Sequence, residues 1–281
     1  MNVSRYELER LLRLRQAHDS CQRTEPVLKV TTEPLRSKDG VDSVCVAFGS
    51  FDPPTMAHVA IMQRAREALH TEEILAIEST RHVDKKVDVR QHSTLYDRAY
   101  MMEACAETVT NLAVAMTNVG LFVDLLPQVN AVYKHADVSF VMGVDVLEKL
   151  ADTKYYTSAD ERDSALKLLC THRIAVSDRD VGTVETVNDV VARVPALQPH
   201  ADSFVRVEQP RSLLGLSATT VRSNRRQGLS IADMVPPAVA DIVQRWALYE
   251  DNDRYARFVA VREEYATSKN VHDLAAQIQA I

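Results

Sequence analysis

Glycine and cysteine are scarce in this 281-residue chain, which holds seven glycines and four cysteines. The cysteines, Cys21, Cys45, Cys105 and Cys170, lie far apart and form no C-x-x-C pair. This spacing argues against a zinc site or a disulfide framework and favours a reducing compartment. We therefore expect a cytoplasmic protein, with the nucleus as the alternative. Because glycines are so few, one that follows a strand carries more weight as a place where the backbone approaches a ligand.

Long basic runs and apolar segments of membrane-spanning length are also missing. The formal net charge is −6, with 33 Lys and Arg residues against 39 Asp and Glu residues. This acidic balance disfavours nucleic acid as the main partner, and we expect no membrane partner either. It leaves room for a locally positive pocket that binds a small phosphorylated ligand. Hydrophobic residues make up 46% of the chain, enough for the core of one large domain with appendages.

The pattern along the chain suggests three regions. We expect an N-terminal extension over 1–40, a central domain over 41–250 and a C-terminal helical extension over 251–281. The opening stretch "MNVSRYELERLLRLRQ" places leucines at helical spacing. Its two glutamates argue for an amphipathic helix packed on the domain rather than a transit peptide. An irregular polar segment follows this helix and ends at "SKDG".

The central domain alternates β-branched apolar runs with helical patterns. The expected strands cover 43–48, 73–78, 112–117, 138–143, 172–177 and 203–208. The expected helices cover 58–69, 95–109, 159–169 and 218–227, and a further helix has Pro237 in its first turn. This alternation predicts an α/β fold, a Rossmann-like doubly wound parallel sheet, with ligands bound beyond the carboxyl ends of the strands.

The stretch "GSFDPPTMAH" places candidate phosphate-binding groups directly after the first expected strand. Gly49 lets the backbone approach a ligand, and the N–H groups of Ser50 and Phe51, with those at the start of the next helix, form an anion site. Thr55 and His58 are three residues apart, so a hydroxyl and an imidazole share one helical face. The alternative is an ordinary helix with Thr55 as N-cap and His58 on the surface. We favour phosphate binding because the strand, the glycine and the di-proline turn occur together.

A second stretch, "LLGLSATTVRSNRRQG", has a similar design. Ser217 is the expected N-cap of a helix on which Thr219 and Arg222 are three residues apart and share a face. Two hydroxyls, free helix-start N–H groups and a guanidinium together form a clamp for phosphate oxygens. The alternative is a capped helix whose arginines are solvated.

These two stretches resemble paired motifs of the nucleotidylyltransferase superfamily, (T/H)-x-G-H and I-S-x-T-x-x-R. Together they resemble the nicotinamide/nicotinate mononucleotide adenylyltransferases over about residues 43 to 250, which implies a nucleotidyltransferase fold. Ala57 stands where the first motif has glycine, and Leu216 and Ala218 replace Ile and Ser in the second. These changes conserve size and leave the hydroxyls, the imidazole and the guanidinium in place.

The stretch "SFVMGVDVLEKL" resembles the G-x-D segment that follows the fourth strand of this family. Its Gly143 and Asp145 come directly after an expected strand. An acidic residue there can accept hydrogen bonds from ribose hydroxyls, as in dinucleotide-binding folds. The alternative is that Asp145 only caps the helix that follows.

The acceptor site is the least readable part of the sequence. The segment "ESTRHVDKKVDV" resembles the one in which a lysine of the family meets the mononucleotide phosphate. Members of the family stack the pyridine ring on aromatic side chains. The only tryptophan, Trp246, is expected in the core, which leaves Phe122 and two tyrosines as stacking candidates. The residues assigned to the mononucleotide are Ser50, Phe51, Lys85, Lys86, Arg98, Tyr155 and Tyr156.

The resemblance implies an enzyme that transfers the adenylyl group of ATP to nicotinamide mononucleotide, to nicotinate mononucleotide, or to both. The 5′-phosphate of the acceptor attacks the α-phosphorus in line and expels pyrophosphate, forming NAD or its deamido form. His58 and Arg222 are the expected catalytic residues: His58 donates to the α-phosphate, and Arg222 stabilises the departing pyrophosphate. Gly49, Ser50, Phe51, Thr55, Gly143, Asp145, Ser217 and Thr219 complete the expected ATP site. Mg²⁺ is expected to be held through the ATP phosphates rather than by protein ligands.

Other functions stay open on the sequence. One is another nucleotidylyltransferase, acting on phosphopantetheine or using CTP. A second, from a different class, is a non-catalytic nucleotide-binding protein, since a fold alone does not establish activity. The intact hydroxyl and imidazole pair argues against the second alternative. The sequence also leaves open whether the chain forms a homo-oligomer and what its two extensions do.

Overall fold

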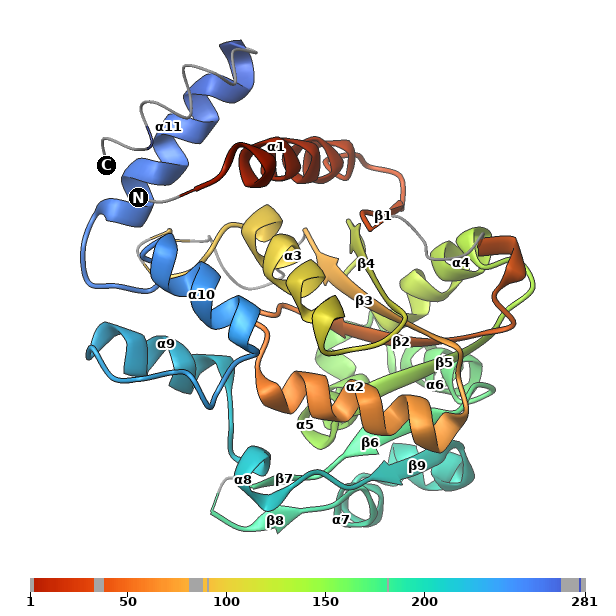
Figure 1. Ribbon diagram of the computed structural model, residues 1–281. Helices are drawn as coiled ribbons and strands as arrows, with labels where there is room; N and C mark the ends of the chain where they lie inside the picture. The colour runs from red at the N-terminus through yellow and green to blue at the C-terminus, as the bar shows by residue number, and fades with distance from the viewer. Residues whose placement is uncertain are drawn as a thin grey trace.

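The computed structural model describes residues 3–32, 38–80, 88–89, 91–180, 182–268 and 278. A seven-stranded sheet runs through the molecule in the order β1-β4-β3-β2-β5-β6-β9 (Figure 1). Its strands are β1 (Leu28–Val30), β2 (Ser43–Gly49), β3 (Glu73–Ser79), β4 (Leu112–Thr117), β5 (Asp137–Gly143), β6 (Ile174–Ser177) and β9 (Phe204–Val207). A small second sheet pairs β7 (Arg179–Asp180) with β8 (Val184–Glu185).

In the main sheet, the six strands β4, β3, β2, β5, β6 and β9 are all parallel, which confirms the predicted doubly wound sheet. All six were expected from the sequence, within two residues at either end. The chain winds outward from β2 in both directions, through β3 and β4 on one side and β5, β6 and β9 on the other. The direction of winding therefore reverses beside β2, and this reversal opens a crevice at the carboxyl ends of the strands.

The polar segment after the first helix was expected to be irregular, and in its described part this is wrong at one place. It contains β1, which pairs antiparallel with β4, with Leu28 opposite Thr117. A strand of three residues is too short to show an alternating pattern. The region expected as an N-terminal extension therefore contributes the edge strand of the main sheet.

Helices cover both faces of the sheet (Figure 1). One face carries α1 (Arg5–Ser20), α2 (Met56–Leu69), α3 (Leu95–Ala104), α9 (Ala218–Arg226), α10 (Pro237–Arg245) and α11 (Arg254–Ser268). The other carries α4 (Phe122–Val132), α5 (Val144–Leu150), α6 (Ala159–Leu169) and α7 (Val187–Arg193). The short elements are α8 (Arg211–Leu214) and the 3₁₀ turns Lys38–Gly40, Cys105–Glu107, Thr153–Tyr155 and Pro195–Ser203.

Alternating side chains of the central strands reach these two helical layers. On β2, Cys45 and Ala47 join the core under α2 and α3, whereas Val44 and Val46 join the core under α4 and α5. Burial on both faces explains why the strands read as continuous apolar runs rather than as alternating ones.

The first helix, α1, packs on the outer side of α3, and α11 lies near one end of α1 (Figure 1). Leu8, Leu11 and Leu14 of α1 are buried, which confirms the expected amphipathic helix. An ion pair at 2.8 Å between Arg15 and Glu263 joins α1 to α11. None of the helices in the described ranges is long and apolar enough to span a bilayer, and all four cysteines are free thiols.

Candidate active site

The first motif forms the loop between β2 and α2. Gly49 ends β2, and a Cβ there would lie 3.2 Å from the ring of Phe51, so glycine lets this aromatic side chain fold back against the strand. Phe51 has a φ of +37°, in the left-handed region that costs a non-glycine residue about 1–3 kcal/mol. Backbone strain of this size persists only where the surrounding contacts hold it in place.

Thr55 and His58 begin α2 with reciprocal capping bonds. The N–H of His58 donates to the Thr55 hydroxyl at 3.3 Å, and the N–H of Thr55 donates to Nδ1 of His58 at 3.0 Å. A backbone N–H can only donate, so Nδ1 must be the acceptor, and the proton of the neutral ring lies on Nε2. Burial lowers the pKa of His58 to about 4, although the Asp145 carboxylate opposes this effect. Near neutral pH, His58 is therefore a neutral ring with an Nε2–H donor.

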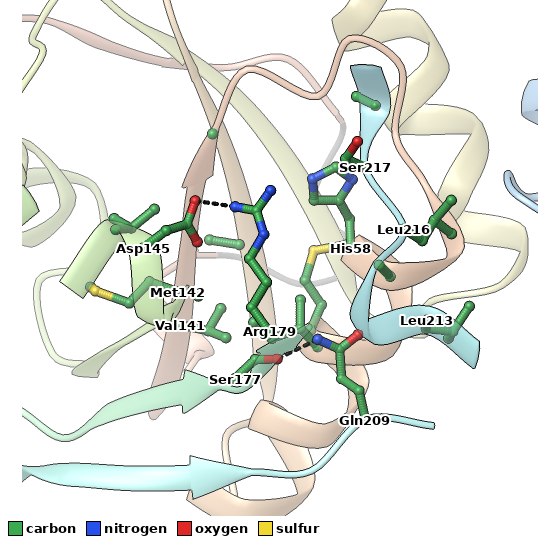
Figure 2. Close-up of a pocket in the computed structure, with 18 of the residues that line it drawn as sticks. His58, Val141, Met142, Asp145, Ser177, Arg179, Gln209, Leu213, Leu216 and Ser217 are labelled. Carbon is green, nitrogen blue, oxygen red and sulfur yellow. Dashed lines mark hydrogen bonds and ion pairs between the residues drawn. The ribbon is translucent and has the colours of Figure 1, made fainter. Parts of the chain in front are cut away.

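A cavity of about 320 Å³ lies at the carboxyl ends of β2, β5 and β6, where the crevice was expected. Seven of the residues predicted for ATP line it: Gly49, Ser50, Phe51, His58, Gly143, Asp145 and Ser217. Thr55 is fully buried and lies behind His58, so it orients the imidazole without lining the cavity. In Figure 2, His58 and Ser217 lie on one side of this cavity and Asp145 lies on the other.

The second motif meets the first in space. Ser217 caps α9 by accepting from the N–H of Thr220 at 3.1 Å. Arg222, one turn into the helix, donates from Nη2 to the Thr219 hydroxyl at 3.2 Å and from Nη1 to the backbone carbonyl of Asp52. Asp52 lies in the first motif, 170 residues earlier in the chain. The fold therefore brings together both segments that the sequence marked as phosphate-binding, although Thr219 and Arg222 themselves line neither this cavity nor the one beside it.

Asp145 faces the cavity, but it is not free. Gly143 is the N-cap of α5 and no side chain caps this helix, so Asp145 is not the cap. Its carboxylate forms an ion pair with Arg179 at 2.5 Å, and Figure 2 shows Arg179 extending across the cavity to reach it. A Cβ on Gly143 would lie 2.9 Å from Oδ1 of Asp145, so this glycine leaves room for the carboxylate.

Arg179, Ser177 and Gln209 were missed in the sequence. They line the same cavity, and the amide nitrogen of Gln209 donates to the Ser177 hydroxyl at its floor (Figure 2). Ser177 ends β6 and Arg179 begins the next element. Residues at or just after the carboxyl end of a parallel strand are expected near the ligand, and this rule identified Asp145. The same rule could have identified Ser177 and Arg179.

A second cavity of about 260 Å³ adjoins the first at the carboxyl end of β2. The two cavities share the lining residues Phe48, Gly49, Ser50 and Val146. Tyr155 and Tyr156 line the second cavity, as does Phe122, whose ring packs edge-on against Phe48 with centroids 5.2 Å apart. Three of the aromatic stacking candidates are therefore gathered in one place.

Two positive elements border this second cavity. Lys149 lines it, and so do Leu121 and Phe122, which begin α4 without a side-chain cap. The N–H groups at the start of a helix carry partial positive charge. The described residues that line the cavity include no Asp or Glu.

The remaining predicted residues lie elsewhere. Arg98 is buried, 2% exposed, and bonds to the Ser93 carbonyl beneath the first motif, so it lines neither cavity. Lys85 and Lys86 lie outside the described residues. Trp246 is fully buried, as expected, with its ring tilted against those of Tyr100 and Phe258.

Among the residues that the structure describes, the side chains around the two cavities do not form a metal centre of their own. In the described ranges, no three His, Cys, Asp or Glu side chains come together as metal ligands. Two carboxylates line the first cavity, and both are paired with arginines: Asp145 with Arg179 and Asp178 with Arg206. This donor set fits a divalent ion carried in by a triphosphate better than one held in a protein cage.

Comparison with known proteins agrees with this geometry. Residues 46–224 match the model of the family described as cytidylyltransferase-like. The chain is 26% identical over 213 residues to the "Probable nicotinate-nucleotide adenylyltransferase" of Gemmatimonas aurantiaca, covering 73% of this chain and 92% of the relative. It is 27% identical over 207 residues to the protein of the same name in Herpetosiphon aurantiacus, covering 72% and 95%.

A solved structure shares the fold. It is the nicotinic acid mononucleotide adenylyltransferase of Plasmodium falciparum complexed with NaAD, which matches with a TM-score of 0.55 and 16% sequence identity. The match covers 75% of this chain and 98% of that one.

Proposed function

The chain belongs to the cytidylyltransferase-like family, and within it we propose that this protein transfers the adenylyl group of ATP to a pyridine mononucleotide, with nicotinate mononucleotide as the preferred acceptor. The products are the dinucleotide and pyrophosphate, so the reaction belongs to NAD biosynthesis. The relatives named as nicotinate-nucleotide adenylyltransferases support this choice.

The observation that carries the proposal is the pair of adjoining cavities. The first gathers His58 and Ser217 from the two motifs, and the second gathers aromatic side chains. They meet at Gly49 and Ser50, the end of β2. In-line transfer needs the acceptor phosphate and the α-phosphorus of ATP side by side, and a shared wall between two sites provides that arrangement.

Residues of the first cavity contribute electrostatic stabilisation rather than covalent chemistry. The Nε2–H of His58 donates to an α-phosphate oxygen, where negative charge develops in the transition state. Thr55 holds that ring in the required tautomer through its N–H bond to Nδ1. Ser217 and the free N–H groups at the start of α9 bind the β- and γ-phosphates, and Arg222 stabilises the departing pyrophosphate.

The second cavity favours the nicotinate form of the acceptor. Tyr155, Tyr156 and Phe122 offer ring faces or edges to a flat pyridine. Lys149 and the uncapped start of α4 favour a carboxylate over a neutral carboxamide, because both carry positive charge. The described residues that line the cavity include no acidic side chain, and the nearest acidic residue on α4 is Asp124 in its first turn.

Mg²⁺ enters with ATP in this proposal, held by the phosphates and water. It supplies neutralisation of the triphosphate charge. His58 and Ser217 line the first cavity, where they would act on the same phosphates from the protein side.

One experiment tests the proposal. Pyrophosphate release is measured from ATP with nicotinate mononucleotide, with nicotinamide mononucleotide and with phosphopantetheine, and from CTP with each acceptor. We expect release from ATP with nicotinate mononucleotide, and a lower kcat/KM with the nicotinamide form. Release with phosphopantetheine only, from CTP only, or with none of the acceptors would refute the proposed function.

A further inference from the structure

Asp52 is a buried carboxylate in the loop between β2 and α2, and it is 4% exposed. Its Oδ1 accepts hydrogen bonds from the N–H of Ser93 at 3.1 Å, the Ser93 hydroxyl at 2.6 Å and the Tyr249 hydroxyl at 2.8 Å. Its Oδ2 accepts from Nδ1 of His92 at 2.5 Å. These bonds come from three residues and fix the orientation of the carboxylate.

Two guanidinium groups lie beside the same carboxylate. Nη2 of Arg98 is 3.4 Å from Oδ2, and Nη1 of Arg222 is 3.7 Å from it. Burial disfavours the charged form of Asp52, but the His92 bond and the two arginines outweigh burial and hold its pKa well below the ordinary value. Asp52 is therefore a negative charge at neutral pH, and it attracts both guanidinium groups.

The two arginines differ in how exposed their side chains are and in what else they contact. Arg98 is as buried as Asp52, with side chains 3% and 5% exposed, and it could balance the carboxylate alone. Arg222 is more exposed, at 13%, and comes from the second motif. Its Nη1, the nitrogen that faces Oδ2, also donates to the backbone carbonyl of Asp52, and its Nη2 donates to the Thr219 hydroxyl at 3.2 Å. The bonds from Nη1 and Nη2 together fix the plane of the guanidinium, and the Asp52 carboxylate adds charge attraction on the Nη1 side.

We propose that Asp52 is a positioning residue for adenylyl transfer, because its carboxylate holds the Arg222 guanidinium in the orientation that receives the triphosphate. Neither Asp52 nor Arg222 lines the two cavities, but the Arg222 side chain is 13% exposed against 5% for Asp52, so the contact with the triphosphate is assigned to Arg222 and not to Asp52. It acts through Arg222. The inference rests on the proposed function where it is tested by reaction rates. A second test, which measures ATP affinity, requires only that the protein binds ATP.

The test is a double-mutant cycle between Asp52→Asn and Arg222→Ala. Asparagine keeps the size of the side chain and an acceptor for Ser93 and Tyr249, but it removes the charge that faces Arg222. We expect Asp52→Asn to lower kcat/KM for ATP by about 10- to 30-fold in the wild-type background. In the Arg222→Ala background we expect less than about a threefold effect, because the residue through which Asp52 acts is gone.

Asp97→Asn is the matched control. Asp97 is also a fully buried carboxylate paired with an arginine, Arg262, and it lies near the same start of α3. Its loss should lower the thermal midpoint while leaving kcat per folded molecule within about twofold. Should Asp52→Asn fail to fold, Tyr249→Phe removes one hydrogen bond from Asp52 and keeps the charge. We expect it to lower kcat/KM by about two- to fivefold, only when Arg222 is present.

The same cycle is measured on ATP affinity by calorimetry, which needs no turnover. Loss of affinity on Asp52→Asn in the wild type, but not in Arg222→Ala, supports the positioning role. If Asp52→Asn lowers kcat/KM or ATP affinity by the same factor with and without Arg222, the positioning role is wrong. If the wild-type protein releases no pyrophosphate, the proposed function is wrong. The double-mutant cycle on ATP affinity still tests the role of Asp52 in that case.

Discussion

Replacing His58 by alanine removes two things from the molecule, and the structure separates them. The imidazole provides an Nε2–H donor at the first cavity. It also provides Nδ1, which accepts the N–H of Thr55 at 3.0 Å and closes the capping box of α2. The variant therefore loses a donor to the reacting phosphate and a cap at the start of a helix.

The sizes of the two losses differ. Removing one preorganised donor from a developing negative charge costs about 10²- to 10³-fold in kcat, or about 2.7–4 kcal/mol. Leaving the buried Thr55 N–H without its acceptor costs about 1–2 kcal/mol of unfolding free energy. We expect His58→Ala to lose about two to three powers of ten in turnover and to remain folded, with a modestly lower unfolding midpoint.

The assay combines pyrophosphate release with denaturant unfolding, and Thr55→Val is its control. Valine removes the hydroxyl that accepts the His58 N–H at 3.3 Å but leaves the imidazole and its bond to the Thr55 N–H. Thr55→Val should lose a similar amount of stability, with no more than about a tenfold loss in kcat. Equal kcat losses in the two variants, or near wild-type turnover in His58→Ala, would show that the imidazole does not take part in the chemistry.

Three further outcomes follow from the described contacts. Arg262→Met leaves the buried Asp97 without its bidentate partner, so unfolding in denaturant should show a loss of about 3–5 kcal/mol; a loss below about 1 kcal/mol would contradict this. Tyr156→Ala should raise the KM for the mononucleotide several-fold and leave the KM for ATP unchanged, since Tyr156 lines only the second cavity. Burial lowers the pKa of His58 to about 4, below about 6.5 in the unfolded chain. Its contribution to stability should therefore be full above pH 6.5 and fall between pH 6.5 and 4, and this fall should be missing from the pH–stability curve of His58→Ala.

Much of the fold could be predicted because its signals are local. The strand that ends at Gly49 reads as a continuous apolar run, and the helices after Thr55, Ser158 and Ser217 begin with N-caps visible in the sequence. Each of these signals needs only a few consecutive residues. The short strand β1 was missed because its partner, β4, is more than 80 residues away.

The candidate site divides in the same way. Local sequence marked both motifs and placed His58, Asp145 and Ser217 at the carboxyl ends of strands, and the fold gathers all three at one cavity. Local sequence could not show that Arg179 pairs with Asp145, because that contact depends on how β6 and its following loop lie against α5. Thr55 looked like a phosphate ligand, but tertiary packing buries it behind His58.

The amino-acid sequence by itself determined the chemistry available to this protein: a buried parallel sheet, two helix starts that carry hydroxyls, one imidazole and one guanidinium. Only the tertiary structure decided which charges face each other. Asp52 meets Arg222 across 170 residues of chain and Tyr249 across 197. The physical reason is that periodicity and capping act over one or two turns, whereas the partner of a buried charge is set by packing between elements far apart in the chain.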